Sequence, residues 1–266
     1  MHVFVEGVGV LGPGLPGWQA SRGMLAGRVP YVPAPTVLTA SPLLPPAERR
    51  RSVPTVKLAM AVGMEAIVHA GRDPAAVATV FTSSSGDPDT IHRILETLAS
   101  DQRELSPTRF HNSVHNAPAG YWSIATQSRE PSTSLSHEDG SFQAGLLEAA
   151  AEAAVDGWDV ALIAYDLPYP APLDGVRRIS DPFGIALLLA PQRTERSLAR
   201  LDVAVSPASA EPTRMTDPRL ESLRTGNPVA RGLPLLAALA RGADDAVVLP
   251  YRPDRRITIA VGPPCR

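Results

Sequence analysis

The sequence predicts a layered α/β fold, and three observations support this prediction. Strand-like apolar runs alternate with helical patterns along the chain, which is typical of α/β domains. After Asp159, the run 159–164 is continuously apolar, as is the run 183–190, which is expected of central strands that are buried on both faces. No internal repeat or low-complexity tail interrupts the 266 residues, so we expect one domain over residues 1–266.

The N-terminal elements follow from local patterns. Residues 3–10 alternate apolar and small side chains and stop at Gly12, Pro13 and Gly14, which predicts a strand that ends in a turn. Residues 53–70 carry apolar side chains at helical spacing, and Gly71 suits the end of that helix. The other elements expected here are a short helix over 15–26, an extended connection over 31–46, a strand over 77–82 and a helix over 89–98.

The remaining elements continue the alternation of helices and strands. The two apolar runs are the central strands of this part, and residues 206–229 are rich in Pro, Ser and Arg, which indicates an irregular excursion. The other elements expected here are helices over 115–126, 141–155 and 233–240, and strands over 132–136, 201–205 and 256–261.

The composition favours a soluble protein that binds neither nucleic acid nor membranes. Hydrophobic residues make up 44% of the chain and charged residues 20%, and the formal net charge of −2 provides no basic field for such partners. No apolar run approaches the roughly twenty residues of a transmembrane helix. The N-terminus also lacks the basic and apolar regions of a signal peptide, so we expect a cytoplasmic protein.

The sequence gives no cofactor signal. Cys265 is the only cysteine, which excludes an intramolecular disulfide and a cysteine-based zinc site. His111 and His115 lie four residues apart without a third ligand at fixed spacing, so we favour ordinary hydrogen bonds over a metal site. The glycines of residues 5–14 and the TSSSG segment at 82–86 do not complete a nucleotide-binding motif. We expect neither a cofactor nor a metal.

The most specific pattern lies between Ser106 and Gly145. It reads SPTRFHNSVHNAPAGYWSIATQSREPSTSLSHEDGSFQAG, which we interpret as a loop, a helix, a short strand, a turn and an apolar helix. This order resembles the N-terminal half of β-ketoacyl synthases. Further segments resemble landmarks of that family in the same order, namely VFVEGVGVLGPG, ERRRSVPTVKLAMAVGMEAI, VATVFTSSSGDPDTI, DVALIAYD and DPFGIALLLA. The resemblance implies half of a thiolase fold, with a mixed central sheet covered by helices on both faces.

The turn after the short strand departs from the ketosynthase pattern. Ketosynthases carry their acyl-accepting cysteine there, whereas this chain has His137, Glu138, Asp139 and Gly140. None of these side chains can replace the thiolate that forms an acyl thioester. The chain also has no histidine after His137, so the histidines of the family's second half are missing. We therefore expect no catalytic residue and no enzymatic activity of the chain on its own.

These departures resemble the truncated chain-length factors of aryl polyene and xanthomonadin-type pigment clusters. Such proteins have lost the cysteine and pair with an active ketosynthase. The resemblance implies a heterodimer with a cysteine-bearing ketosynthase subunit and an acyl chain delivered by an acyl carrier protein. It also implies a place in polyene, polyketide or fatty-acid-like biosynthesis.

The resemblance further implies which residues meet the partner. In the thiolase fold, the strand before the turn pairs with the partner at the dimer seam, and its free edge needs such pairing. From the neighbouring helix, Tyr121 and Trp122 are the predicted apolar anchors, assisted by Ile124. The strand residues predicted at the seam are Ser132, Thr133, Ser134, Leu135 and Ser136.

The loop before that helix is expected to reach into the partner's acyl pocket. This expectation assigns Arg109, Phe110 and Val114 to the floor or gate of an acyl tunnel. Bulk at the floor would limit how many carbons fit, because each additional buried CH₂ contributes about 0.8 kcal/mol only while space remains.

Two other functions remain open from the sequence. His137 with Glu138 or Asp139 could serve a stand-alone thioesterase or decarboxylase, although Asp139 could instead cap the following helix. Arg49, Arg50 and Arg51 could recruit a carrier protein, although short basic runs are commonly solvated.

Overall fold

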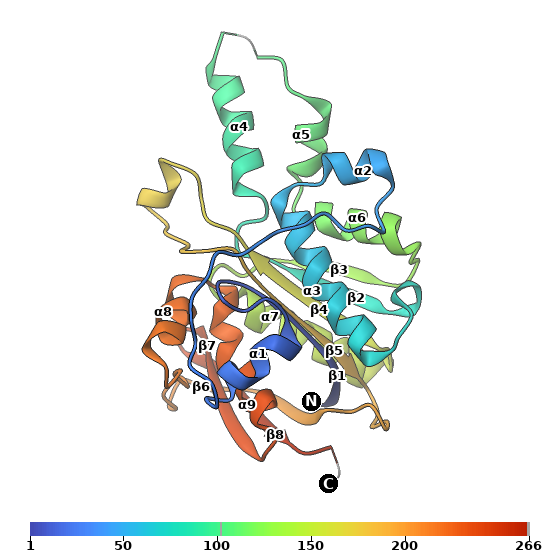
Figure 1. The fold of residues 1–266 in the computed structure, drawn as a ribbon, viewed down its shortest axis with the longest axis vertical. Coiled ribbons are helices and arrows are strands. Elements are labelled where there is room, and N and C mark those ends of the chain that lie inside the picture. The colour runs from blue at the N-terminus through green and yellow to red at the C-terminus, as the bar shows by residue number, and fades with distance from the viewer. Residues whose placement is uncertain (102, 265–266) are drawn as a thin grey trace.

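The computed structural model describes residues 1–101 and 103–264, which form a mixed sheet packed between helices (Figure 1). The eight strands hydrogen-bond in the order β3-β2-β4-β5-β1-β6-β8-β7. The pairs β2–β3 and β2–β4 are parallel, and the other neighbouring pairs are antiparallel. The strands are β1 (His2–Leu11), β2 (Ala78–Thr82), β3 (Ser132–Leu135), β4 (Val160–Asp166), β5 (Phe183–Ala190), β6 (Ala199–Pro207), β7 (Asp245–Arg252) and β8 (Arg255–Gly262).

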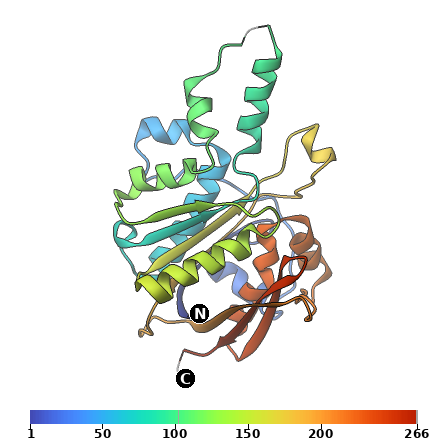
Figure 2. The same ribbon diagram turned by 180° about the vertical axis from the view of Figure 1, so that it is seen from behind.

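Helices cover both faces of the sheet, as Figures 1 and 2 show. The α-helices are α1 (Trp18–Leu25), α2 (Pro46–Arg51), α3 (Pro54–Ala70), α4 (Pro88–Ala99), α5 (Pro107–Asn112), α6 (Ala117–Thr126), α7 (Ser141–Ala151), α8 (Pro218–Gly226) and α9 (Leu233–Arg241). Short helices are η1 (Pro74–Ala76), η2 (Glu152–Asp156), η3 (Leu173–Gly175) and η4 (Val229–Gly232). Among the described residues, no helix is both long and apolar enough to cross a membrane.

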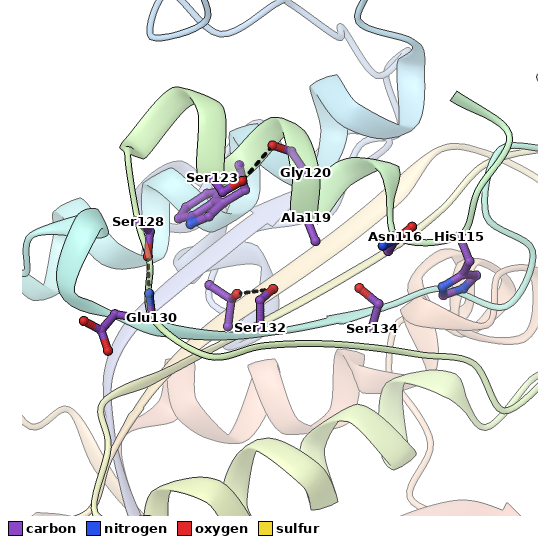
Figure 3. Close-up of a pocket in the computed structure, with 11 residues that line it drawn as sticks. His115, Asn116, Ala119, Gly120, Ser123, Ser128, Glu130, Ser132 and Ser134 are labelled. Atoms are coloured by element: carbon purple, nitrogen blue, oxygen red, sulfur yellow. Dashed lines mark hydrogen bonds between the residues drawn. The ribbon is translucent and has the colours of Figure 1, made fainter. Parts of the chain in front are cut away.

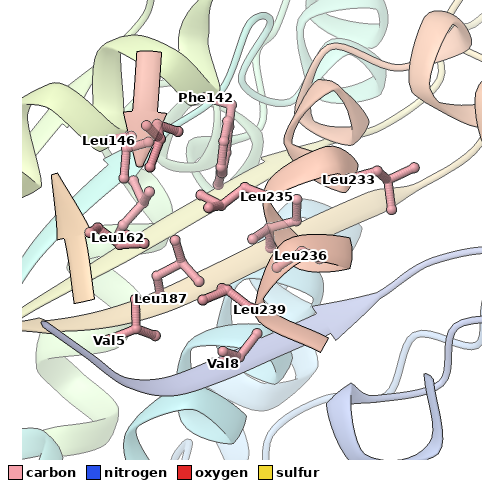
Figure 4. Close-up of a cluster of buried hydrophobic side chains, with 14 of the residues drawn as sticks. Val5, Val8, Phe142, Leu146, Leu162, Leu187, Leu233, Leu235, Leu236 and Leu239 are labelled. Atoms are coloured by element: carbon pink, nitrogen blue, oxygen red, sulfur yellow. The ribbon is translucent and has the colours of Figure 1, made fainter. Parts of the chain in front are cut away.

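Each face of the sheet has its own apolar core. Strand β4 shows the division, because Leu162 belongs to one core and its neighbour Ile163 to the other. On one face, α7 and α9 pack against β1, β4 and β5 through Phe142, Leu146 and the leucines of α9 (Figure 4). On the other face, α3 and α6 pack against the same sheet. The fully buried β4 and β5 confirm the predicted central strands.

Strand β1 and helix α3 lie unusually close together because β1 has glycines where they meet. A Cβ on Gly7 would lie 1.9 Å from the carbonyl oxygen of Ala66, and a Cβ on Gly9 would lie 2.0 Å from that of Val62. A side chain at either position would therefore collide with helix backbone. Gly71 ends α3 with a φ of 64°, the left-handed conformation expected at a helix C-terminus.

Some predicted elements need correction. Residues 206–229 are not irregular throughout, because they contain α8, which Asp217 caps by accepting from the amides of Arg219 and Leu220. Strand β7 and the short helices α2 and α5 are additional to the prediction. Strand β7 contacts both α7 and α9, so the C-terminal hairpin folds back beside the start of α7.

Candidate functional site

A sharp turn joins the edge strand β3 to α7 at the carboxyl end of the parallel strands. Glu138 in this turn has a φ of 45°, a left-handed conformation that few non-glycine residues adopt. The Ser141 hydroxyl donates to the carbonyl of Glu138 at 2.7 Å and accepts from the amide of His137 at 2.9 Å, which holds the turn closed. The Glu138 side chain is exposed. At the strand-to-helix turn, where ketosynthases carry their cysteine nucleophile, this chain therefore presents the carboxylate of Glu138.

Asp139 is held by two arginines from distant parts of the chain. Arg177 donates to its Oδ1 at 2.7 Å, and Arg231 donates to its Oδ2 at 2.8 Å. The N-cap of α7 is Gly140, and no side chain caps this helix. The expectation that Asp139 caps α7 is therefore wrong, because the carboxylate turns toward the two guanidinium groups instead.

His137 and Asp139 of the turn each contact other parts of the chain. The His137 ring packs against Tyr251 of β7, with ring centroids 4.9 Å apart. Within residues 1–101 and 103–264, this imidazole has no hydrogen bond to a carboxylate, and Asp139 is already paired with two arginines. A histidine that activates a nucleophile is normally oriented by a third group. Cys265 lies outside the described residues.

Sequence reasoning missed a buried carboxyl group near this turn. Asp166 ends β4 and is 0% exposed. Its Oδ1 accepts from the Ser83 hydroxyl and from the Ser84 hydroxyl and amide, each at 2.9 Å. Burial raises the pKa of Asp166 to about 6, although these hydrogen bonds and the charge of Arg177 act to lower it. An acid at the carboxyl end of a buried strand is the signal that could have revealed this cluster.

His111 and His115 make separate contacts within the chain. His115 lies between α5 and α6, where its Nε2 donates to the Ser83 carbonyl at 3.2 Å. His111 lies on α5 and makes an edge contact with Tyr121, with ring centroids 6.0 Å apart. In the part of the chain that the structure describes, no group of three or more His, Cys, Asp or Glu side chains could hold a metal ion.

An open groove of about 560 Å³ lies between α6 and the strands β2 and β3 (Figure 3). β3 lies at the end of the sheet with β2 as its neighbour, which confirms that the predicted strand is an edge. On the β3 side, the groove is lined by Ser132 and Ser134, and the Thr79 hydroxyl of β2 donates to that of Ser132 at 2.9 Å. Ser136 lies beyond the strand and leads into the turn.

Helix α6 forms the other wall of this groove with three small residues and Trp122. Ala119, Gly120 and Ser123 line it, and a Cβ built on Gly120 would meet nothing within 4 Å. His115 and Glu130 lie toward opposite ends of the groove (Figure 3). The groove is therefore open space between α6 and the side chains of β2 and β3 at the end of the sheet.

The predicted anchors Tyr121 and Trp122 are core residues. They are only 1% and 2% exposed, so neither provides a protruding apolar side chain for a partner. Trp122 makes an edge contact with Phe81 of β2, and a Cβ on Gly63 of α3 would lie 2.9 Å from its ring. Packing of α6 against α3 and β2 buries both rings, although Trp122 still lines the groove, so their role at a partner interface stays a prediction. Ile124, in contrast, is 37% exposed.

The predicted tunnel residues lie on or beside a short helix rather than a loop. Helix α5 forms because Pro107 occupies its first turn and the Ser106 hydroxyl accepts from the amide of Arg109. Arg109 is exposed, Phe110 is 62% exposed, and Val114 just after the helix is 47% exposed. All three side chains are thus available at the surface of this chain.

Two of the three arginines of α2 make contacts within the chain. Arg49 donates to the carbonyl oxygens of Pro42 and Leu44, which fixes the preceding connection. Arg51 pairs with Glu48 at 3.2 Å. The run is therefore not a uniformly free basic patch.

Comparison with known proteins places the fold. The family model "Beta-ketoacyl synthase, N-terminal domain" matches residues 21–245. A chain of the complex between the ketosynthase ApeO and its chain length factor ApeC from Xenorhabdus doucetiae is 22% identical, with a TM-score of 0.74 over 98% of this chain and 99% of that chain. A chain of the ishigamide ketosynthase/chain length factor is 14% identical, with a TM-score of 0.72 over 98% of both chains.

A third similar structure contains a carrier protein. A chain of the AntDE:AntF complex, a type II polyketide acyl-carrier protein with its ketosynthase, is 12% identical, with a TM-score of 0.72 over 98% of this chain and 99% of that chain. No curated protein sequence matches the chain. The structural similarities confirm the thiolase-like ketosynthase fold, of which this chain has roughly the N-terminal half. Because the family model covers most of the sequence, the chain belongs to the β-ketoacyl synthase family, in its N-terminal domain.

Proposed function

We propose that this chain is a non-catalytic chain-length factor that pairs with a cysteine-bearing β-ketoacyl-ACP synthase and shapes the acyl tunnel of the pair. The observation that carries the proposal is the free edge of β3, with its open groove, beside a turn that holds Glu138 instead of a thiol. The chain thus offers a surface for pairing, while the nucleophile that accepts the acyl chain comes from the partner.

The similar structures support this proposal. Two of them are ketosynthase and chain-length-factor assemblies, and in each the matched chain aligns with this one almost from end to end. The AntDE:AntF structure contains an acyl carrier protein with its ketosynthase. By analogy, we propose that an acyl carrier protein delivers the growing chain to the pair, in polyene, polyketide or fatty-acid-like biosynthesis.

Pairing would satisfy the exposed backbone of β3. A partner strand alongside Ser132–Leu135 would supply hydrogen bonds to the donors and acceptors on its outer edge. The small side chains of Ala119, Gly120 and Ser123 would let a helix or strand of the partner approach α6 closely.

We further propose that Arg109, Phe110 and Val114 reach into the acyl tunnel of the partner. These side chains belong to a projecting part of the chain, and Phe110 is largely exposed in the absence of a partner. A ring at the end of an apolar tunnel stops extension when the next two-carbon unit no longer fits, because the added methylenes then gain no burial.

The length of the product tests this role. In the reconstituted pair with a carrier protein, Phe110→Ala is expected to lengthen the main product by one or more two-carbon units, because the truncation removes bulk from the tunnel. The readout is mass spectrometry of the released acyl chains. Since Phe110 is 62% exposed in this chain, the variant should fold normally.

Trp158→Ala is the matched control. Trp158 is an exposed aromatic residue just before β4, at the opposite end of the parallel strands from the turn. Its truncation should leave the product length unchanged. A Phe110→Ala pair that assembles and makes products of the original length would refute the tunnel assignment.

A further inference from the structure

Helix α4 carries an apolar stripe that the described residues of this chain leave exposed. Ile91, Leu95 and Leu98 are 37%, 53% and 44% exposed. They stand at positions i, i+4 and i+7, and therefore share one face of the helix. Only Pro88 and Thr90 of α4 are buried, and both lie in its first turn. The rest of the helix projects from the body beside α5, as Figures 1 and 2 show.

The base of α4 is firmly attached to the body of the protein. The Asp87 carboxylate accepts from the amide of Thr90 at 2.9 Å, which caps the helix, and from the hydroxyl of Thr55 in α3 at 2.7 Å. Beyond this base, a helix of twelve residues gains little stability in water by itself. The stripe is therefore held at a defined place, and packing against another surface would stabilise the helix that carries it.

The groove along β3 is too small to account for a stable pair. Eleven residues line it, whereas stable protein interfaces use about 20–30 residues on each side. A subunit that pairs with β3 must therefore bury additional surface of this chain. That surface has to be continuous with the groove.

The segment that carries α4 and α5 meets this requirement. It leaves the carboxyl end of β2, the strand that pairs with β3. It returns through His115 and Asn116, which line the groove. The surface bordering the groove at this point therefore leads directly onto the projecting helices.

We propose that α4 is a second docking element for the same ketosynthase-fold subunit that pairs with β3. The apolar stripe inserts into an apolar groove on that subunit, with Leu95 as its central anchor. The spacing of Ile91, Leu95 and Leu98 is that of amphipathic helices which dock into grooves. This inference rests on the proposed pairing and adds a contact beyond the strand edge.

A pair of single substitutions on α4 tests the inference. Leu95→Glu places a charge in the centre of the stripe, and Arg93→Gln changes a half-exposed residue on the opposite side of the helix. Both lower the formal net charge by one, so long-range electrostatics are matched. We expect Leu95→Glu to weaken the complex roughly ten- to hundredfold and Arg93→Gln to leave its dissociation constant within about twofold. Equal dissociation constants for the two variants would overturn the inference.

Amide hydrogen exchange of the unmodified chain gives an independent test. When the ketosynthase is added, residues 88–99 should become protected together with residues 132–135. Protection of 132–135 alone would overturn the role of α4 and leave the proposed pairing intact. Protection of neither segment would show that the chain does not pair in this way, which rejects the proposed function and this inference together.

Discussion

At the carboxyl end of β4, the carboxyl group of Asp166 makes the stability of this chain depend on pH. Its Oδ1 has three hydrogen-bond donors, whereas Oδ2 has none among the described residues. Burial consequently dominates and raises the pKa from 3.8 to about 6. A carboxyl group whose pKa is higher in the folded than in the unfolded state stabilises the fold at pH values below its pKa in the unfolded state. This contribution is lost as the pH rises through its pKa in the folded state.

Asp166→Asn should remove this pH dependence. We expect the free energy of unfolding of the variant, relative to that of the wild type, to rise by about 2–3 kcal/mol between pH 4 and pH 7. The asparagine keeps an oxygen that accepts from Ser83 and Ser84 but carries no charge. Urea unfolding over this pH range measures the difference. Parallel pH profiles for the two proteins would show that Asp166 does not titrate as described.

The partners of Asp139 show the limit of residue-level prediction. Its place before an apolar helix suggests a cap, yet it binds Arg177 and Arg231, which lie 38 and 92 residues further along the chain. No local spacing rule covers such separations, because the contacts depend on how the β4–β5 loop and η4 fold over the turn. The position of the turn could be predicted from the sequence, but the partners of its side chains could not.

At the scale of elements, the contact of β1 with α3 depends on backbone glycines. Gly9→Ala should destabilise the chain by about 1–3 kcal/mol or more, because the new Cβ would lie 2.0 Å from the Val62 carbonyl oxygen unless the helix moves. Thermal and urea unfolding measure the loss. Gly120→Ala is the matched control, since its Cβ meets nothing within 4 Å and alanine favours the helix. Equal stabilities of the two variants would contradict the close packing.

Elements with a strong apolar pattern could be predicted from the sequence, and elements with weak patterns could not. The runs at β4 and β5 are continuously apolar and buried. Strand β7 contains Pro250, which demotes a strand in sequence reasoning but is tolerated here because β7 is the outermost strand. The burial of Tyr121 and Trp122 could not be predicted, because a sequence does not reveal which face of α6 meets α3.

At the scale of the whole molecule, the two ends of the sheet differ. At one end, β7 folds back against α7 and α9, and its Tyr251 packs on His137 of the turn. At the other end, β3 leaves an edge and an open groove beside α6. The family resemblance predicted the place of this edge, because the order of segments survives at low sequence identity. The shape of the groove required the three-dimensional structure.

Pairing of the β3 groove with a ketosynthase is tested most directly by co-expression of the two proteins. Size-exclusion chromatography with mass determination then shows whether they form a complex. The wild type and Gly175→Leu should each form a one-to-one complex with a cysteine-bearing ketosynthase from the same source, whereas Gly120→Leu should elute alone. A Cβ at either glycine meets nothing within 4 Å, so both variants should fold, but only Gly120 lines the groove. A wild type that elutes alone, or a Gly120→Leu variant that pairs as tightly as Gly175→Leu, would contradict the account.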